Sequence, residues 1–317
     1  MDQATLRMVS SCLQGSRRLF SYGPEEYALY LLGRQVQDEP RKLSELKDTP
    51  WARLLERPLL KQARGQWGDG LLSSERLAML QSPDPCFFRL TFGEWGDKKQ
   101  QWRNWQQTSR PGYNLVLQLN FNTEHNQHYA QLLDRQIRRW HPFHYGGHPA
   151  RASQEFTLAW ARIDLAEDLS AALIEEIQTD WLRAAREEIV VYRHKQRDAS
   201  GQWREWTEKK SRHALDLKKM EHYLQQILSP YEDIWAPAML LATIQLLWEE
   251  IGVEKIYYHT YDTGCLLKNC RPPRSLYTSL PKRFCFAETE TIPGFLWPFL
   301  RKDRRLRGKT LRFWELA

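Results

Sequence analysis

Cysteine is scarce in this chain, and the few cysteines present are not spaced as pairs. Five occur among 317 residues, at positions 12, 86, 265, 270 and 285, and no two of them form a CxxC motif. An odd number of cysteines without paired spacing argues against a disulfide framework and against a zinc ribbon. The sequence therefore predicts free thiols and a reducing, cytoplasmic location.

Long apolar runs are also absent. The most apolar stretch, Ala236 to Trp248, is interrupted by Thr243 and Gln245 and is shorter than a bilayer-spanning helix requires. Residues 1–20 contain polar side chains throughout and lack the apolar core of a signal peptide. We therefore expect no membrane segment and no secretory leader.

The common nucleotide and hydrolase motifs are missing. The chain contains no Walker loop, no GxGxxG, no GxSxG and no HExxH. These motifs supply the phosphate cradle, the nucleophile elbow and the histidine pair of a catalytic zinc ion. Their absence disfavours the common nucleotide-dependent enzymes, serine hydrolases and zinc proteases.

The chain does have an excess of positive charge and many tryptophans. It carries 46 Lys and Arg against 39 Asp and Glu, a net charge of +7, and 14 Trp. Two Trp-rich segments, 95–105 and 201–206, resemble hairpins, and aromatic residues flank a basic tail at 301–312. This basic Trp/Arg-rich surface favours nucleic acid or an acidic partner protein. A dispersed, solvated surface charge is the alternative.

The order of apolar patterns predicts an α/β (α+β) fold. Residues 1–84 are expected to form a helical N-terminal region, and residues 85–317 a mixed twisted sheet flanked by helices. Strands are predicted at 86–92, 115–121, 156–165, 172–178, 255–260, 284–289 and 310–316. Helices are predicted at 124–140, 179–188, 214–228, 236–251 and 275–282, with Gly252 ending the fourth of them. A polar hairpin is predicted at 189–207, turning at 198–201, and residues 101–106 could return as a hairpin strand after 86–92.

A family resemblance begins at Leu173-Ile174-Glu175-Glu176-Ile177-Gln178-Thr179-Asp180-Trp181. This segment resembles the "EIQSDW" signature of domains in large polyvalent proteins of bacteriophages and mobile elements. Matching features are the strand 158–164, the Trp, helix, Gly, strand and Thr-Gly order of 235–264, and the stretch 276–282, which contains Tyr277 and ends in Leu-Pro-Lys. The resemblance covers roughly residues 144–290 and implies a phage or mobile-element background, without a settled activity.

The same half of the chain resembles the N-acetyltransferase (GNAT) superfamily in its order of elements. The resemblance implies a strand with acid residues at Glu175 and Glu176, a central helix from Ala236, a strand at Ile256, a helix with Tyr277 and a final strand pair. It also implies transfer of an acyl group to an amine, with an acyl-coenzyme A cofactor whose pyrophosphate meets a helix N-terminus. The glycine-rich loop expected before that helix is missing, because Gly201 is the only glycine between 180 and 236. Either the cofactor binds differently, or coenzyme A does not bind.

The signature strand supplies the candidate site. Strand alternation points Glu176, Gln178 and Asp180 to one face, and Glu175, Ile177 and Thr179 to the other. One carboxylate could act as a general base if burial raised its pKa. A structural hydrogen-bond network is the alternative.

A right-handed crossover through the buried helix makes this strand and the strand at Ile256 parallel neighbours. Their carboxyl ends then meet at one sheet edge, where such sheets bind ligands. We expect Glu176, Gln178 and Asp180 to project into a pocket there. His259 and Tyr277 are expected at its rim, Tyr277 as the acid of an acyltransferase.

Histidines gather around one loop. His141, His144 and His148 follow His125 and His128. Imidazoles suit zinc, but this spacing fits no metal motif, so no metal is predicted and His144 or His148 is expected to line the same cleft.

Two functions therefore remain open from the sequence. The first is a GNAT-like acyltransferase, and the second is a non-catalytic module that binds nucleic acid or a partner protein.

Overall fold

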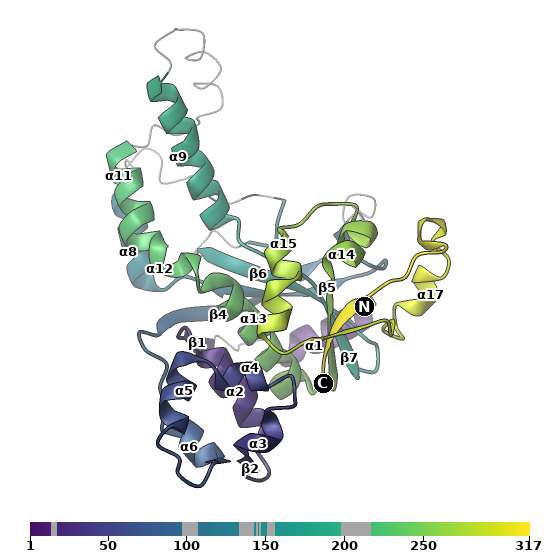
Figure 1. Cartoon of the computed structure of the whole chain (residues 1–317). Coiled ribbons are helices and arrows are strands. Elements are labelled where there is room, and N and C mark those ends of the chain that lie inside the picture. Colours follow the sequence, from purple (N-terminus) through teal and green to yellow (C-terminus); the bar gives the residue numbers. More distant parts are fainter. Residues whose placement is uncertain are drawn as a thin grey trace.

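A computed structural model describes residues 1–13, 18–96, 107–132, 143, 145, 147–150, 156–197 and 217–317. The α/β class predicted from the sequence is confirmed: one twisted eight-stranded sheet is flanked by helices (Figure 1). None of the described helices is both long enough and apolar enough to cross a membrane.

The sheet has the strand order β1-β4-β5-β6-β7-β8-β10-β9. Its strands are β1 (Arg18–Tyr22), β4 (Cys86–Trp95), β5 (Asn114–Asn120), β6 (Thr157–Leu165), β7 (Ala171–Gln178), β8 (Lys255–His259), β9 (Ala287–Thr289) and β10 (Phe313–Leu316). Within the described residues, the neighbours are antiparallel except for β7 and β8, which are parallel. The predicted parallel pairing of these two strands is therefore confirmed.

The centre of the sheet is buried on both faces. Every residue of β5 and of β6 is buried. Their apolar runs predicted strands, because strands covered on both sides need not alternate with polar residues. Gln118 of β5 is paired across the sheet, because Thr91 Oγ1 of β4 donates to its Oε1 at 2.7 Å.

The N-terminal region is not helical throughout. It has the helices α1 (Gln3–Leu13), α2 (Glu26–Gln35), α3 (Leu43–Leu46), α4 (Ala52–Leu55), α5 (Pro58–Arg64) and α6 (Ser74–Ala78). It also has β2 (Arg41–Lys42) and β3 (Leu71–Leu72), which pair with each other, and β1, which pairs with β4 in the main sheet. In β1, Phe20 and Tyr22 are buried while Leu19 is 81% exposed. This alternation within five residues is too short to have predicted a strand.

The most apolar helix covers one face of the sheet. It consists of α13 (Trp235–Gln245), continued by the π-helical turn η4 (Leu246–Ile251), and it packs against β6, β7 and α2. Residues 236–244 are all buried, as a helix with no polar face requires. Gly252 ends it in the left-handed conformation with φ of 78°, which confirms the predicted role of this glycine.

A second helical group stands beside the sheet (Figure 1). It comprises α8 (Thr123–Leu132), α9 (Trp181–Arg197), α11 (Leu217–His222), the π-helical η3 (Tyr223–Leu228) and α12 (Ser229–Glu232). The predicted polar hairpin from Ile189 is wrong up to Arg197, because α9 continues there. Leu182, Ala185 and Ile189 are buried at helical spacing and hold this helix in place. The turn predicted at 198–201 and the Trp-rich segments at 97–106 and 201–206 lie outside the described residues.

The C-terminal part packs on both faces of the sheet: Leu276, Tyr277 and Leu280 join the main core beside the buried helix, whereas Leu267 and Leu300 belong to a second cluster. It contains α14 (Tyr261–Lys268), α15 (Arg274–Tyr277), α16 (Ser279–Arg283), α17 (Trp297–Leu300) and the 3-10 turn η5 (Arg304–Leu306). A separate apolar cluster there joins Leu173 and Tyr257 to Leu267, Leu300 and Phe313. The helix α14 was not predicted, although Thr260 caps its first turn and Asn269 ends it at φ of 50°.

Candidate functional site

The sheet opens between β7 and β8. Their ladder joins residues 171–174 to residues 255–258, pairing Ile174 with Tyr258 at its end. The strand β7 continues to Gln178, so its last four residues have no partner on β8. This divergence leaves Glu175 to Gln178 without a neighbouring strand at the carboxyl end of β7. The pocket predicted for Glu176, Gln178 and Asp180 stays a prediction, because these residues line neither of the cavities among the described residues.

A register shift in β7 changes which side chains share a face. Ile163 of β6 pairs with Ile174, whereas Arg162 pairs with Glu176, so Glu175 has no ladder partner on β6. A bulge of this kind adds one residue to the strand and redirects its side chain. Glu175 accepts from Ser109, and Glu176 is joined through Arg162 to the neighbouring Gln107. The predicted separation of the two carboxylates onto opposite faces therefore does not hold at this bulge.

Glu175 is the centre of a buried polar triangle. Its Oε2 lies 3.0 Å from His259 Nε2 and 3.0 Å from Ser109 Oγ, and Ser109 Oγ lies 3.0 Å from the same nitrogen. The Ser109 backbone N–H also donates to Oε1 at 2.8 Å. Glu175 and His259 are both 0% exposed, whereas Ser109 is half-buried. Ser109 therefore links the buried pair to the surroundings.

The pKa values of Glu175 and His259 are both lowered, which leaves the carboxyl group charged and the imidazole uncharged. Burial by itself raises the pKa of Glu175, but His259, the Ser109 N–H and the charge of Lys268 together lower it to about 2. Burial lowers the pKa of His259 below its usual range, despite Glu175. At neutral pH we therefore expect an ionised Glu175 beside a neutral imidazole.

Glu176 forms an ion pair with Arg162, which is itself fully buried. The Arg162 guanidinium lies 4.9 Å from the centroid of the Trp95 ring, and it donates to the Gln107 carbonyl at 2.9 Å. Burial raises the pKa of Glu176, but the charges of Lys268 and Arg162 outweigh that effect and lower it. Glu176 is therefore held as a carboxylate.

Lys268 is a functional candidate that the sequence did not predict. It is 1% exposed, and its Nζ donates to the Glu175 carbonyl at 2.8 Å and to the Tyr277 hydroxyl at 2.6 Å. Burial lowers the pKa of Lys268 and raises that of Tyr277 well above its usual value. The lysine occupies the hydrogen-bonding position that β8 leaves vacant by diverging, and it brings the predicted Tyr277 to the same point.

Gln178 and Asp180 belong to a second, adjoining cluster. Asp180 accepts from Gln178 Nε2 at 2.7 Å, His148 Nδ1 at 2.8 Å, Trp160 Nε1 at 3.0 Å and Arg183 Nη2 at 2.6 Å. His148 is thus bonded to the signature residues Gln178 and Asp180, while His141 and His144 lie outside the described residues. Burial raises the pKa of Asp180, but His148 and Trp160 more than offset this and lower it.

Two expectations about these residues need correction. No carboxylate of the signature has a raised pKa: those of Glu175, Glu176 and Asp180 are all lowered, because each accepts hydrogen bonds from cations or N–H groups. A base with a raised carboxylate pKa is therefore not available among them. His259 and Tyr277 are also buried, at 0% and 1% exposure, and do not stand at an open rim.

The pyrophosphate of coenzyme A fits neither the start of α9 nor the start of α13. At the start of α9, Trp181 and Leu182 are buried, Thr179 Oγ1 caps the Leu182 N–H at 3.4 Å, and the Asp180 carboxylate stands beside them. At the start of α13, Pro237 lacks an N–H, and Glu232 and Asp233 precede the helix. A pyrophosphate needs exposed N–H groups and no competing negative charge, so neither helix end suits it.

A cavity of about 490 Å³ adjoins the buried triangle. Ser109 lines it together with Leu267, Asn269 and residues of the 299–305 segment, among them Lys302 and Arg305. Several charges of the basic tail are already paired, since Arg305 binds Asp303 and Arg312 approaches Glu288 and Glu290. This cavity is the access to Ser109 that the described residues provide.

Other chemistry finds less support in the described residues. No three His, Cys, Asp or Glu side chains among them gather as a metal site requires. All five cysteines are unpaired, and burial raises the pKa of Cys270, which disfavours a thiolate there.

Comparison of the chain with family models, with curated proteins and with solved structures gives no match.

Proposed function

We propose that this chain is an enzyme of the N-acyltransferase type, which moves an acyl group onto an amine at the divergence of β7 and β8. The observation that carries the proposal is the parallel strand pair that opens over Glu175, His259, Lys268 and Tyr277. The GNAT-like order of elements and the mobile-element background implied by the signature agree with it. The unpaired cysteines suit a cytoplasmic location.

The chemistry uses Ser109, which lines the cavity, and the buried residues that are linked to it. The amine nitrogen attacks the acyl carbon, a C–N bond forms, and the bond to the leaving group breaks. The amine gives its proton to Ser109 Oγ, and the Ser109 hydroxyl, which donates to Glu175 Oε2 at 3.0 Å, passes its own proton to that carboxylate. The His259 Nε2–H donates to the same oxygen at 3.0 Å and holds the carboxylate in place. Tyr277, kept protonated by burial and bonded to Lys268, supplies a proton to the leaving group.

The donor in this proposal is not coenzyme A held at a helix N-terminus, because Asp180 and Trp181 close the end of α9. The chemical requirement that remains is an activated acyl group small enough to reach Ser109. A thioester without a pyrophosphate meets that requirement.

The test is amine acylation with an N-acetylcysteamine thioester, which has no pyrophosphate, beside acetyl-coenzyme A. Lysine peptides and polyamines are the acceptors, and mass spectrometry of the amine is the readout. We expect acylated amine from the full chain, and at least about a tenfold loss with His259→Ala or Tyr277→Phe. Tyr257→Phe is the matched control, because this tyrosine precedes the site on β8 and is not in the proton path. Absence of product from both donors would overturn the proposal.

The second candidate is a non-catalytic module that binds nucleic acid or a partner protein. It is favoured by the positive net charge and by a surface groove in which lysines and histidines gather. Nucleic-acid affinity that falls steeply with salt is its signature. A gel-shift at low salt, with no retarded species, would remove the nucleic-acid branch of this candidate.

A further inference from the structure

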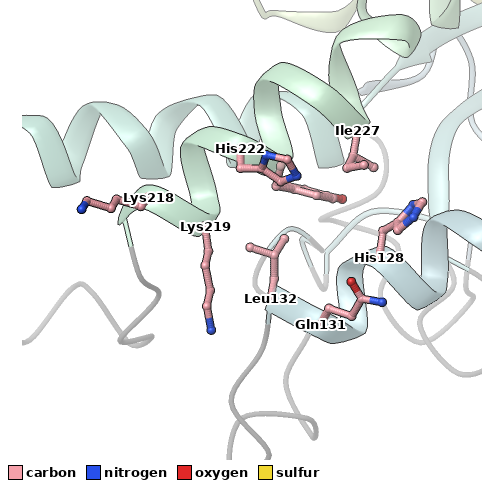
Figure 2. Close-up of a pocket in the computed structure, with 8 residues that line it drawn as sticks. His128, Gln131, Leu132, Lys218, Lys219, His222 and Ile227 are labelled. Carbon is pink, nitrogen blue, oxygen red and sulfur yellow. The ribbon is translucent and has the colours of Figure 1, made fainter.

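A groove of about 370 Å³ lies between α8 and the α11–η3 helix, away from the β7–β8 opening (Figure 2). Three residues form its apolar floor: Leu132, Tyr223 and Ile227. The floor is fixed, because the Tyr223 hydroxyl is bonded to His125 Nε2 at 2.7 Å and to Trp181 Nε1 at 2.8 Å. Tyr223 is therefore held in place beneath the groove, and π-helical turns such as η3 often occur at functional sites.

The walls and mouth of the groove carry cations and imidazoles. His128 of α8 and His222 of α11 stand on its two sides, and Lys218 and Lys219 project from α11 at its end (Figure 2). Among the described residues that line it, none is acidic. The chemistry that matches is a planar, partly apolar group joined to phosphates, since histidines stack on bases and lysines contact phosphate.

We propose that this groove binds single-stranded nucleic acid, with one base over the apolar floor between His128 and His222 and the flanking phosphates at Lys218 and Lys219. A cavity of this volume takes one nucleotide unit. An acidic peptide would also meet the lysines, but it would leave the two imidazoles without a stacking partner. This inference rests on the second candidate function, nucleic-acid binding, and identifies the groove as its site. It does not depend on acyl transfer.

The test measures binding of a fluorescent oligo(dT) by anisotropy over a series of salt concentrations with the full chain. We expect the double variant Lys218→Gln/Lys219→Gln to weaken binding and to reduce the slope of log K against log salt by about 1.4, because each single-strand phosphate contact contributes about 0.7. His222→Ala should weaken binding about fivefold and leave the slope unchanged, because it removes stacking and not charge.

The matched control is Lys47→Gln/Lys61→Gln, which removes the same charge from exposed positions outside the groove and outside the basic tail. If both double variants weaken binding equally, net charge suffices and the groove assignment is overturned, while nucleic-acid binding itself stands. If the unchanged chain does not bind oligo(dT) at low salt, the groove assignment and the nucleic-acid branch of the second candidate function both fall. If polyglutamate competes as well as unlabelled oligo(dT), the groove selects anions without reading bases, and the nucleic-acid assignment is overturned.

Discussion

Glu175 has an environment that should make the stability of the protein depend on pH. Its carboxylate is fully buried and accepts from the Ser109 N–H and hydroxyl, with His259 at 3.0 Å. Its pKa is lowered to about 2 in the folded chain. A depressed pKa stabilises the folded state above the pKa of the unfolded chain, and this contribution is lost as the pH falls toward the folded value.

We predict that Glu175→Gln lowers the free energy of unfolding by about 3 kcal/mol at pH 7, which is the energy equivalent of this pKa shift. The difference between variant and unchanged protein should shrink from about pH 4.5 downward and be nearly gone by about pH 2, because both side chains are then uncharged. Urea unfolding at a series of pH values measures it. An equal difference at pH 7 and at pH 3 would contradict the lowered pKa.

The burial of Lys268 could not be predicted from the sequence around it. A lysine in the last turn of a helix normally faces solvent, so nothing in its neighbourhood indicated burial. It reaches Glu175 and Tyr277 only because α14 follows β8 directly and ends beside the opening. The bulge at Glu175 was equally hidden, since no glycine or proline accompanies it.

At the scale of elements, the strongest patterns predicted the structure well. The apolar runs of β5 and β6 predict strands, and the uniformly apolar stretch of α13 predicts a buried helix. Each is long enough that its pattern fits only one type of secondary structure. The elements that were missed are short or lie beside a motif interpreted differently. β1 has five residues, and Thr260, which caps α14, was included in the predicted strand 255–260.

The end of the buried helix offers a clean comparison between two glycines. Gly252 has φ of 78°, where a side chain is strained, whereas Gly33 in α2 has an ordinary φ and no heavy atom within 4 Å of an added Cβ. We predict that Gly252→Ala lowers the free energy of unfolding by about 1 to 2 kcal/mol. The matched Gly33→Ala should raise it by up to about 1 kcal/mol, since alanine favours helix. Thermal unfolding of the two variants beside the unchanged protein measures both effects. A Gly252→Ala protein that is more stable than the unchanged protein would contradict the left-handed conformation at Gly252.

At the scale of the whole molecule, burial should set the order in which the sheet opens to solvent. β5 and β6 are buried along their full length and have paired neighbours on both sides. β2 and β3 form a separate sheet of two-residue strands. We predict that amides of β5 and β6 exchange with deuterium only on global unfolding, and that those of β2 and β3 exchange by local opening. Hydrogen exchange by mass spectrometry tests this, and rapid exchange in β6 would refute it.

The short ladder between β7 and β8 also has a mechanical consequence. The five strands on one side of it come from residues 18–178, and the three on the other side come from residues 255–316. Among the described residues, the main-chain link between the two groups runs over residues 170–174 and 254–258, and Lys268 on the Glu175 carbonyl reinforces it. Under a load applied across the strands, rupture would begin at this line. The two strand groups would then separate while the strand pairing within each group stays intact, and each group comes from one continuous stretch of sequence.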